Sequence, residues 1–203
     1  MKKSALIFSI LVLVSGCNNP FSIRMSADYF PLKVGNKWIY KVEGEIDYKA
    51  EMEVLSKDTL YNVTIQGENL FFERKLGEIN IVKELKTTYE GEKVIFGKIY
   101  EPYLILPLIE GEKWEKKFTL STVIKGDTIY KNILISIAPA EITSLKVPSG
   151  KYDNVYLIKR TRIEDRDTLK VNEWLAPDVG LIKREIPSNS TKWELEAFIS
   201  NEE

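Results

Sequence analysis

Apolar and polar residues alternate with a period of two along most of the chain. The pattern is clear where one side of the chain is aromatic or aliphatic and the other is charged. The apolar positions there are Trp38, Tyr40 and Val42, and the charged positions are Lys37, Lys41 and Glu43. Because successive side chains of a strand point to opposite faces, this alternation predicts a half-buried β-strand.

Further segments alternate or are rich in β-branched and aromatic residues, with turn-forming residues between them. They cover residues 46–55, 60–66, 70–74, 79–85, 93–100, 114–124, 128–137, 155–163, 168–175, 181–186 and 192–199. Strands at this spacing predict an all-β domain with an antiparallel curved sheet, an open barrel or a sandwich. Residues 138–144 are the most ambiguous piece. In the last segment Phe198 alone breaks the polar face.

Two phrases recur at equal spacing and raise the question of an internal repeat. The first runs from Pro31 to Trp38 and returns from Pro107 to Trp114, with matching Leu, Gly and Lys residues. The second places Gly six residues after an aromatic residue, at Phe71 and at Trp174. A duplication predicts halves 28–103 and 104–203. The alternative is that a proline–glycine turn before a tryptophan strand is a common way to enter a sheet.

The first residues have the order of a secretory signal peptide. Lys2 and Lys3 precede the apolar run 5–14, and small residues precede the single cysteine. The run is shorter than the roughly 20 apolar residues of a transmembrane helix. The pattern Val14-Ser15-Gly16-Cys17 resembles the lipobox of bacterial lipoproteins. This resemblance implies cleavage between Gly16 and Cys17 and acylation of Cys17, with a membrane as partner through the N-terminal lipid.

The expected organisation is therefore a signal peptide (1–16), a lipidated tether (17–27) and a single β domain (28–203). Lipid chains such as palmitate would hold the domain at the cell envelope, because two or more acyl chains anchor stably. Asn18 follows the cysteine. In the enterobacterial sorting rule an aspartate at this position retains a lipoprotein in the inner membrane. The sequence thus favours an outer-membrane protein facing the periplasm, in an organism that has an outer membrane.

Three motifs of the mature chain resemble a family of uncharacterised bacterial lipoproteins and periplasmic proteins. They are the opening 29–40, the turn Val147-Pro148-Ser149-Gly150 with its following residues, and Trp174-Leu175-Ala176-Pro177-Asp178-Val179-Gly180-Leu181. The relatives often have glycine where this chain has Asp178, which leaves the turn type open. The resemblance implies no activity. Turn chemistry of proline and glycine accounts for the motifs themselves.

Composition excludes several classes of function. The chain has no histidine and one cysteine, which removes Ser-His-Asp and Cys-His triads and histidine-based zinc sites. A formal net charge of −1 argues against a nucleic-acid partner. Charges of both signs alternate at 112–117 and at 162–166, which predicts solvated surfaces. Glu164, Asp165 and Asp167 are better explained as a charged hairpin tip than as a calcium site, so we expect no metal and no cofactor.

The function predicted from these observations is a non-enzymatic, membrane-anchored envelope lipoprotein whose β domain serves binding or envelope maintenance. Its protein partner or apolar ligand is open. Five aromatic residues are candidates for lining an apolar site, although aromatics at period two more often form a sheet core. They are Trp38, Tyr40, Trp114, Phe118 and Trp174. One alternative is an acyl-chain or lipid carrier with an apolar cavity, and another is a hydrolase that uses carboxylates alone, such as a glycosidase.

Overall fold

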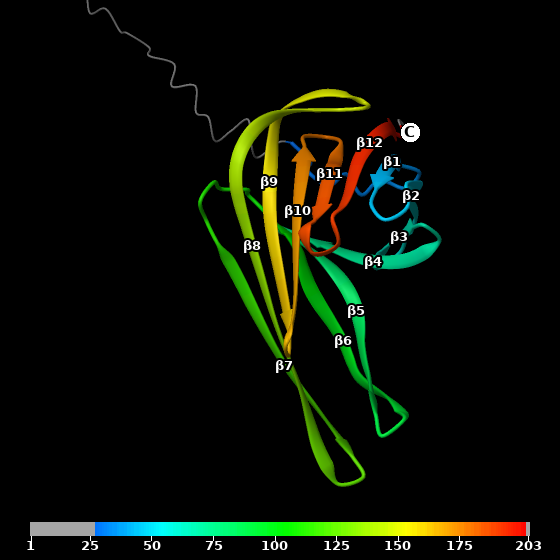
Figure 1. Ribbon diagram of the computed structural model, residues 1–203, viewed down its shortest axis with the longest axis vertical. Coiled ribbons are helices and arrows are strands. Elements are labelled where there is room, and N and C mark those ends of the chain that lie inside the picture. The colour runs from blue at the N-terminus through cyan, green and yellow to red at the C-terminus, as the bar shows by residue number, and fades with distance from the viewer. Residues whose placement is uncertain (1–26, 202–203) are drawn as a thin grey trace, which may run out of the picture.

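A computed structural model describes residues 27–201, with the side chains of 141–143 excepted, and it is nearly all β (Figure 1). Twelve strands form one antiparallel sheet, and a short 3-10 helix (Pro187–Asn189) precedes the last of them. The strands are β1 (Lys37–Glu43), β2 (Tyr48–Lys57), β3 (Tyr61–Ile65), β4 (Glu68–Lys75), β5 (Glu78–Tyr89), β6 (Glu92–Ile105), β7 (Trp114–Ile124), β8 (Asp127–Val147), β9 (Gly150–Glu164), β10 (Asp167–Ala176), β11 (Gly180–Ile186) and β12 (Thr191–Ile199).

The sheet curls into a barrel that is nearly closed and keeps one unsealed seam. Its strand order is β6-β5-β4-β3-β2-β1-β12-β11-β10-β9-β8-β7, so the seam lies between β6 and β7 (Figure 1). The predicted all-β antiparallel class is confirmed, in its open-barrel form. Each half of the chain forms a meander, and the two meanders meet at the β1–β12 pair. The recurring phrases fall at corresponding places, before β1 and β7 and around the β4–β5 and β10–β11 turns. Duplication itself stays a prediction.

The barrel interior is filled with apolar side chains from both halves. Trp38, Tyr40 and Val42 are buried as the alternation predicted, with exposed fractions of 1%, 0% and 0%. They belong to one continuous core cluster that extends to residues of β5, β8, β9 and β12. Two of the buried rings of β1 satisfy their polar atoms, since Tyr40 donates to the carbonyl of Leu181 at 3.0 Å and Trp38 donates to that of Val179. A packed core of this kind stabilises the domain mainly by removing apolar surface from water.

A β-bulge explains why Phe198 breaks the alternation of the last strand. The register between β1 and β12 shifts between Ile39 and Tyr40, so that Trp38 pairs with Phe198 and Tyr40 with Leu195. A bulge places an extra residue in one strand and reverses the faces beyond it. Phe198 therefore stacks on Trp38 with ring centroids 5.2 Å apart, whereas Ile199, predicted on the apolar face, is 52% exposed.

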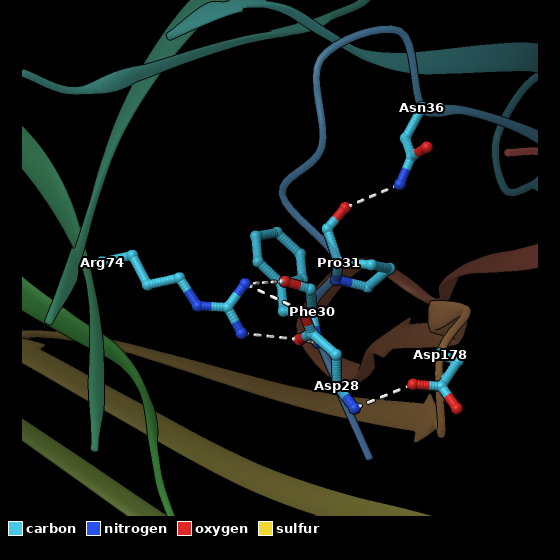
Figure 2. A network of polar contacts seen from close by, with 6 residues as sticks. All are labelled: Asp28, Phe30, Pro31, Asn36, Arg74 and Asp178. Carbon is cyan, nitrogen blue, oxygen red and sulfur yellow. Dashed lines mark hydrogen bonds and ion pairs between the residues drawn. The ribbon is translucent and has the colours of Figure 1, made fainter. Parts of the chain in front are cut away.

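Polar contacts fasten the segment before β1 to Arg74 of β4 and to Asp178 of the β10–β11 turn (Figure 2). The carboxylate of Asp28 accepts two hydrogen bonds from the Arg74 guanidinium, both 2.8 Å long. Asp178 adopts a positive φ of 60° in the β10–β11 turn, and it exchanges two hydrogen bonds with the backbone of Asp28. Aspartate tolerates this left-handed conformation, and a glycine would lack the carboxylate. Phe30 then packs against Phe72 and Tyr103 inside the barrel.

The ambiguous residues 138–144 lie within β8, whose 21 residues continue past the predicted end of that strand. Two register irregularities with β9 occur in this stretch, between Pro139 and Ile142 and between Thr143 and Leu145. These irregularities interrupt the alternation of apolar and polar residues in this part of β8. Within residues 27–201, no helix has the length and apolar content to cross a membrane.

Candidate binding groove at the open seam

The strands on the two sides of the seam share no backbone ladder in the part of the chain that the structure describes. β6 pairs with β5 on its other side, and β7 pairs with β8. Edge strands carry unpaired backbone N–H and C=O groups, which other chains can bind. The seam is therefore the place where the sheet offers main-chain hydrogen-bonding groups along two facing edges.

An apolar groove of about 420 Å³ lies at one end of this seam. Residues of the β4–β5 turn, the end of β6, the start of β7 and the middle of β8 line it. They are Leu76, Gly77, Glu78, Pro102, Ile105, Leu106, Trp114, Glu115, Lys116, Ile135 and Ile137. Trp114 is 42% exposed here. Concave sites with mostly apolar walls and a few polar groups are typical binding sites.

The wall formed by the β4–β5 turn depends on glycine. Gly77 has a φ of 76°, and its carbonyl accepts a hydrogen bond of 2.8 Å from the Leu106 amide at the end of β6. A β-carbon at Gly77 would lie only 3.2 Å from the Leu106 carbonyl oxygen. Glycine thus lets the turn adopt a left-handed conformation and approach the end of β6 closely.

Side chains, rather than backbone groups, hold the two sides of the seam together. Near the groove, Lys116 of β7 lies 3.6 Å from the Glu78 carboxylate of β5. At the far end, Lys125 lies 3.2 Å from Glu90 and 3.4 Å from Glu92, which belong to the β5–β6 hairpin. Exposed ion pairs of this kind contribute little to stability and are screened by salt.

A buried cluster of charges lies inside the barrel and links β6 to the strands of the C-terminal half. Its centre is Glu173 of β10, which is 1% exposed. The Glu173 carboxylate lies 2.6 Å from Arg184 and 2.9 Å from Arg160, and it accepts a hydrogen bond of 3.4 Å from the Tyr103 hydroxyl. Arg160 also donates to the Tyr103 carbonyl at 2.7 Å and packs over the Tyr103 ring.

The environment of Glu173 keeps it ionised. Burial would raise the pKa of this carboxyl, but Arg160 and Arg184 lower it below its ordinary value. Burial and the nearby Glu173 charge raise the pKa of Tyr103 to about 12. Glu173 is thus a paired anion and Tyr103 a neutral phenol, which is the arrangement of a structural ion cluster rather than of a carboxylic acid ready to donate a proton.

A second group of charges continues the cluster toward the hairpin tips. Glu101 of β6 is buried and lies 3.1 Å from Lys83 and 3.2 Å from Arg162. Arg162 and Lys131 both pair with Glu164. The prediction that 162–166 is a solvated surface is therefore wrong for Arg162 and Glu164, whose side chains are 17% and 23% exposed. It holds for 112–117, where each residue is exposed.

The five aromatic candidates lie in different surroundings. Trp38 and Tyr40 are core residues, and Trp38 donates to the Val179 carbonyl at 2.6 Å. Trp174 is partly buried beneath Lys183, whose ammonium lies 4.6 Å from the ring centroid. Trp114 lines the seam groove, and Phe118 lines a separate depression of about 220 Å³. Ligand binding by these residues stays a prediction, and Trp114 is the candidate that the groove contains.

Of the acidic residues at the β9–β10 turn, Asp165 lies in the turn itself and binds the neighbouring strand β8. Asp165 has a φ of 53° and accepts a hydrogen bond from the Asn132 amide at 3.2 Å. Within residues 27–201, no group of three or more histidine, cysteine, aspartate or glutamate side chains is arranged to hold a metal ion. Gly16 and Cys17, the predicted cleavage and lipidation sites, lie outside the described residues.

Sequence reasoning missed the interior charges. Arg160, Arg162 and Glu164 occupy alternate positions of β9, so a period of two places them on one face together with buried apolar residues. The alternation of these charges is visible in the sequence. It does not tell which face of the strand points into the barrel, because that depends on the neighbouring strands.

No protein-family model matches the chain, and a comparison with curated proteins finds no match either. A crystal structure of a protein from Parabacteroides distasonis ATCC 8503, provisionally described as a lipoprotein, has a similar fold. The two proteins superpose with a TM-score of 0.50 and share 15% sequence identity, over 85% of this chain and 99% of that one. This likeness concerns the fold.

Proposed function

We propose that this protein is a lipid-anchored lipoprotein of the cell envelope whose β domain binds a partner at the seam groove without catalysing a reaction. The observation that carries the binding role is the apolar groove at the unsealed seam of a barrel that is otherwise filled. The lipobox-like residues 14–17 support the anchor. A fold shared with a protein provisionally described as a lipoprotein is consistent with it.

The interior carboxylates favour a non-catalytic role over a carboxylate-based hydrolase. A glycosidase needs one carboxylic acid whose pKa is raised, to protonate the leaving group. The pKa of Glu173 is instead lowered by its two arginine partners, and Glu101 is held between Lys83 and Arg162. Removing these cations from the carboxylates would disrupt the core, so the cluster fits a structural role.

The packed interior also favours the groove over a central cavity as the binding site. A carrier of acyl chains encloses its ligand, whereas here the inward side chains of β1, β8 and β9 belong to one core cluster. An acyl chain would have to lie in the groove beside Trp114.

The anchor is tested by expressing the full chain and its Cys17→Ser variant in a bacterium with an outer membrane. We expect the wild type to incorporate labelled palmitate and to sediment with outer membranes, and the variant to do neither. Mass spectrometry of the membrane fraction that finds an unmodified Cys17 would contradict the anchor.

The groove is tested with the environment-sensitive dye 1-anilinonaphthalene-8-sulfonate and the mature chain carrying Cys17→Ser. We expect saturable fluorescence enhancement that falls at least about tenfold in Trp114→Ala, because this ring forms one wall. Tyr130→Ala is the matched control, since Tyr130 is 62% exposed on β8 and lies outside the groove lining. Equal losses in both variants would refute the groove as the site.

A further inference from the structure

The two edges at the seam differ in their ability to accept another strand. β6 carries Pro102, which has no backbone N–H, and Gly97, whose φ of 117° accompanies a register shift between Leu85 and Lys86 of β5. Proline and bulges are the devices by which natural proteins protect an edge from pairing. β6 is thus an interrupted edge.

β7 has neither a proline nor a bulge, and its edge-strand lysines are the exposed Lys116 and Lys117. Its 11 residues, Trp114 to Ile124, contain no proline and no glycine. Its pairing with β8 runs from Trp114–Ile137 to Ile124–Asp127 without a register shift. Every second residue of such a strand directs its N–H and C=O away from the paired neighbour. β7 therefore presents a continuous row of main-chain donors and acceptors toward the seam.

The side chains of β7 divide into two faces that an added strand would extend. Phe118 and Leu120 pack against the core, while Thr119, Ser121 and Val123 are exposed. Trp114 and the apolar groove lie at the start of the same strand. A strand placed beside β7 would direct alternate side chains toward Phe118, Leu120 and the groove, and the others toward solvent.

Access to this edge requires the side chains that bridge the seam to move, including those of the Lys116–Glu78 pair beside the groove. The contacts across the far end of the seam are Lys125 with Glu90 and Glu92, and the Tyr89 hydroxyl with Asp127 at 3.3 Å. The contributing side chains of Lys125, Glu90 and Glu92 are 53%, 58% and 63% exposed. Replacing such pairs by a main-chain ladder favours the bound state.

We infer that the β7 edge is a strand-accepting surface, whose partner is an extended segment of another protein with apolar residues at alternate positions. This inference rests on the proposed function, because it identifies the class of partner for the seam. A polypeptide strand satisfies both the unpaired backbone of β7 and the apolar groove. An acyl chain satisfies the groove alone, since it has no donors or acceptors for the backbone. Addition of a strand to an exposed edge is a general mode of peptide recognition.

The test uses the mature chain with Cys17→Ser and a fluorescein-labelled peptide of alternating valine and threonine, with terminal lysines and the length of β7, 11 residues. A second peptide has the same side chains but is N-methylated at every internal residue, which removes the main-chain donors of both of its edges. We expect saturable binding of the first peptide and at least about tenfold weaker binding of the second, because main-chain hydrogen bonds supply the affinity.

Two proline variants locate the site. Ser121→Pro and Thr122→Pro alter neighbouring amides, one of which points to β8 and the other to the seam. The variant that keeps the wild-type melting temperature has lost only the outward donor, and we expect it to bind the peptide at least about fivefold more weakly. In the wild type, peptide should slow amide hydrogen exchange in β7 rather than in β6.

Three results would overturn the inference: equal binding of the two peptides, protection confined to β6, or a dimer of this chain paired through β7 that excludes the peptide. The dye experiment separates these failures from failure of the proposed function. Dye binding that depends on Trp114, without peptide binding, leaves the groove as a site and removes the strand partner. Absence of both removes the seam as a binding site.

Discussion

β6 and β7 are the two edge strands that face each other across the seam, and they differ in how readily each could pair with another strand. β6 is interrupted by Pro102 and by the bulge at Gly97, whereas β7 runs without either from Trp114 to Ile124. An edge that only had to avoid aggregation would be protected on both sides. The asymmetry indicates that one side is kept closed to other chains and the other is kept available.

The charged cluster around Glu173 links β6 to the strands of the C-terminal half. Breaking this cluster should lower the stability of the domain more than any other change proposed here. Glu173→Leu leaves Arg160 and Arg184 buried without their anion, so we expect the free energy of unfolding to fall by about 3–5 kcal/mol. Urea titration followed by tryptophan fluorescence measures this. Glu185→Leu, whose side chain is 36% exposed and pairs with Lys183 two residues earlier, is the control and should cost about 1 kcal/mol or less. Similar losses in both variants would contradict the structural role of the cluster.

Acid should weaken the same link between the edges. Because the folded-state pKa of Glu173 lies below its unfolded value of about 4.5, its stabilisation is complete above pH 4.5 and is lost as the pH falls through the lower folded value. Thermal unfolding between pH 6 and pH 2 should therefore show a loss of stability in acid. Glu173→Leu should show a smaller loss, and an identical pH profile for the two proteins would contradict the assignment.

The groove wall next to β6 can be changed without touching β7. Gly77→Ala forces a left-handed alanine, at a cost of about 1–2 kcal/mol, and brings its β-carbon to 3.2 Å from the Leu106 carbonyl. Gly91→Ala is a matched control, because Gly91 has a φ of 80° and open space around an added β-carbon. We expect the Gly77 variant to be the less stable of the two by urea titration. It alone should weaken dye binding, and equal effects would mean that the close approach to Leu106 is unimportant.

The smallest effect should come from the contacts that hold the edges together at the hairpin tips. Lys125→Ala removes the ion pairs with Glu90 and Glu92 and should change the free energy of unfolding by less than about 1 kcal/mol. It should nevertheless speed hydrogen exchange near the tips of β6 and β7, and high salt should abolish the difference from wild type. Lys151→Ala, which affects the exposed pair with Asp153, is the control. Unchanged exchange at the tips in the Lys125 variant would show that these pairs do not hold the seam.

The alternation in the sequence was enough to predict the strands, because a period of two is a local property. The segment 114–124 was predicted with the bounds that β7 has in the structure. The reversal at Phe198 was not predictable, since the bulge depends on how β12 pairs with β1. A register shift of this kind depends on which strands pair in the folded sheet, and the alternation along a single strand does not reveal that pairing.

The candidate site was predictable only in part for a related reason. Trp114 was named as a possible ligand-binding residue, but nothing local distinguished it from Trp38, because each tryptophan ends one copy of the same phrase. The difference arises because β1 is central in the sheet and β7 is its edge. Likewise, the charges of β9 indicated a solvated surface until the closing barrel placed Glu101 and Glu173 opposite them.

The fastening of Asp28 to Arg74 and Asp178 has a consequence for the orientation of the domain. Arg74 stands two residues before Leu76, which lines the groove, so the chain enters the domain at the groove end of the barrel. With the lipid that we propose on Cys17, the intervening stretch to Asp28 can span at most about 35–40 Å even when fully extended. With that lipid in place, the entry point of the domain would lie within this distance of the bilayer surface, and a partner strand would have to reach the seam groove close to the membrane.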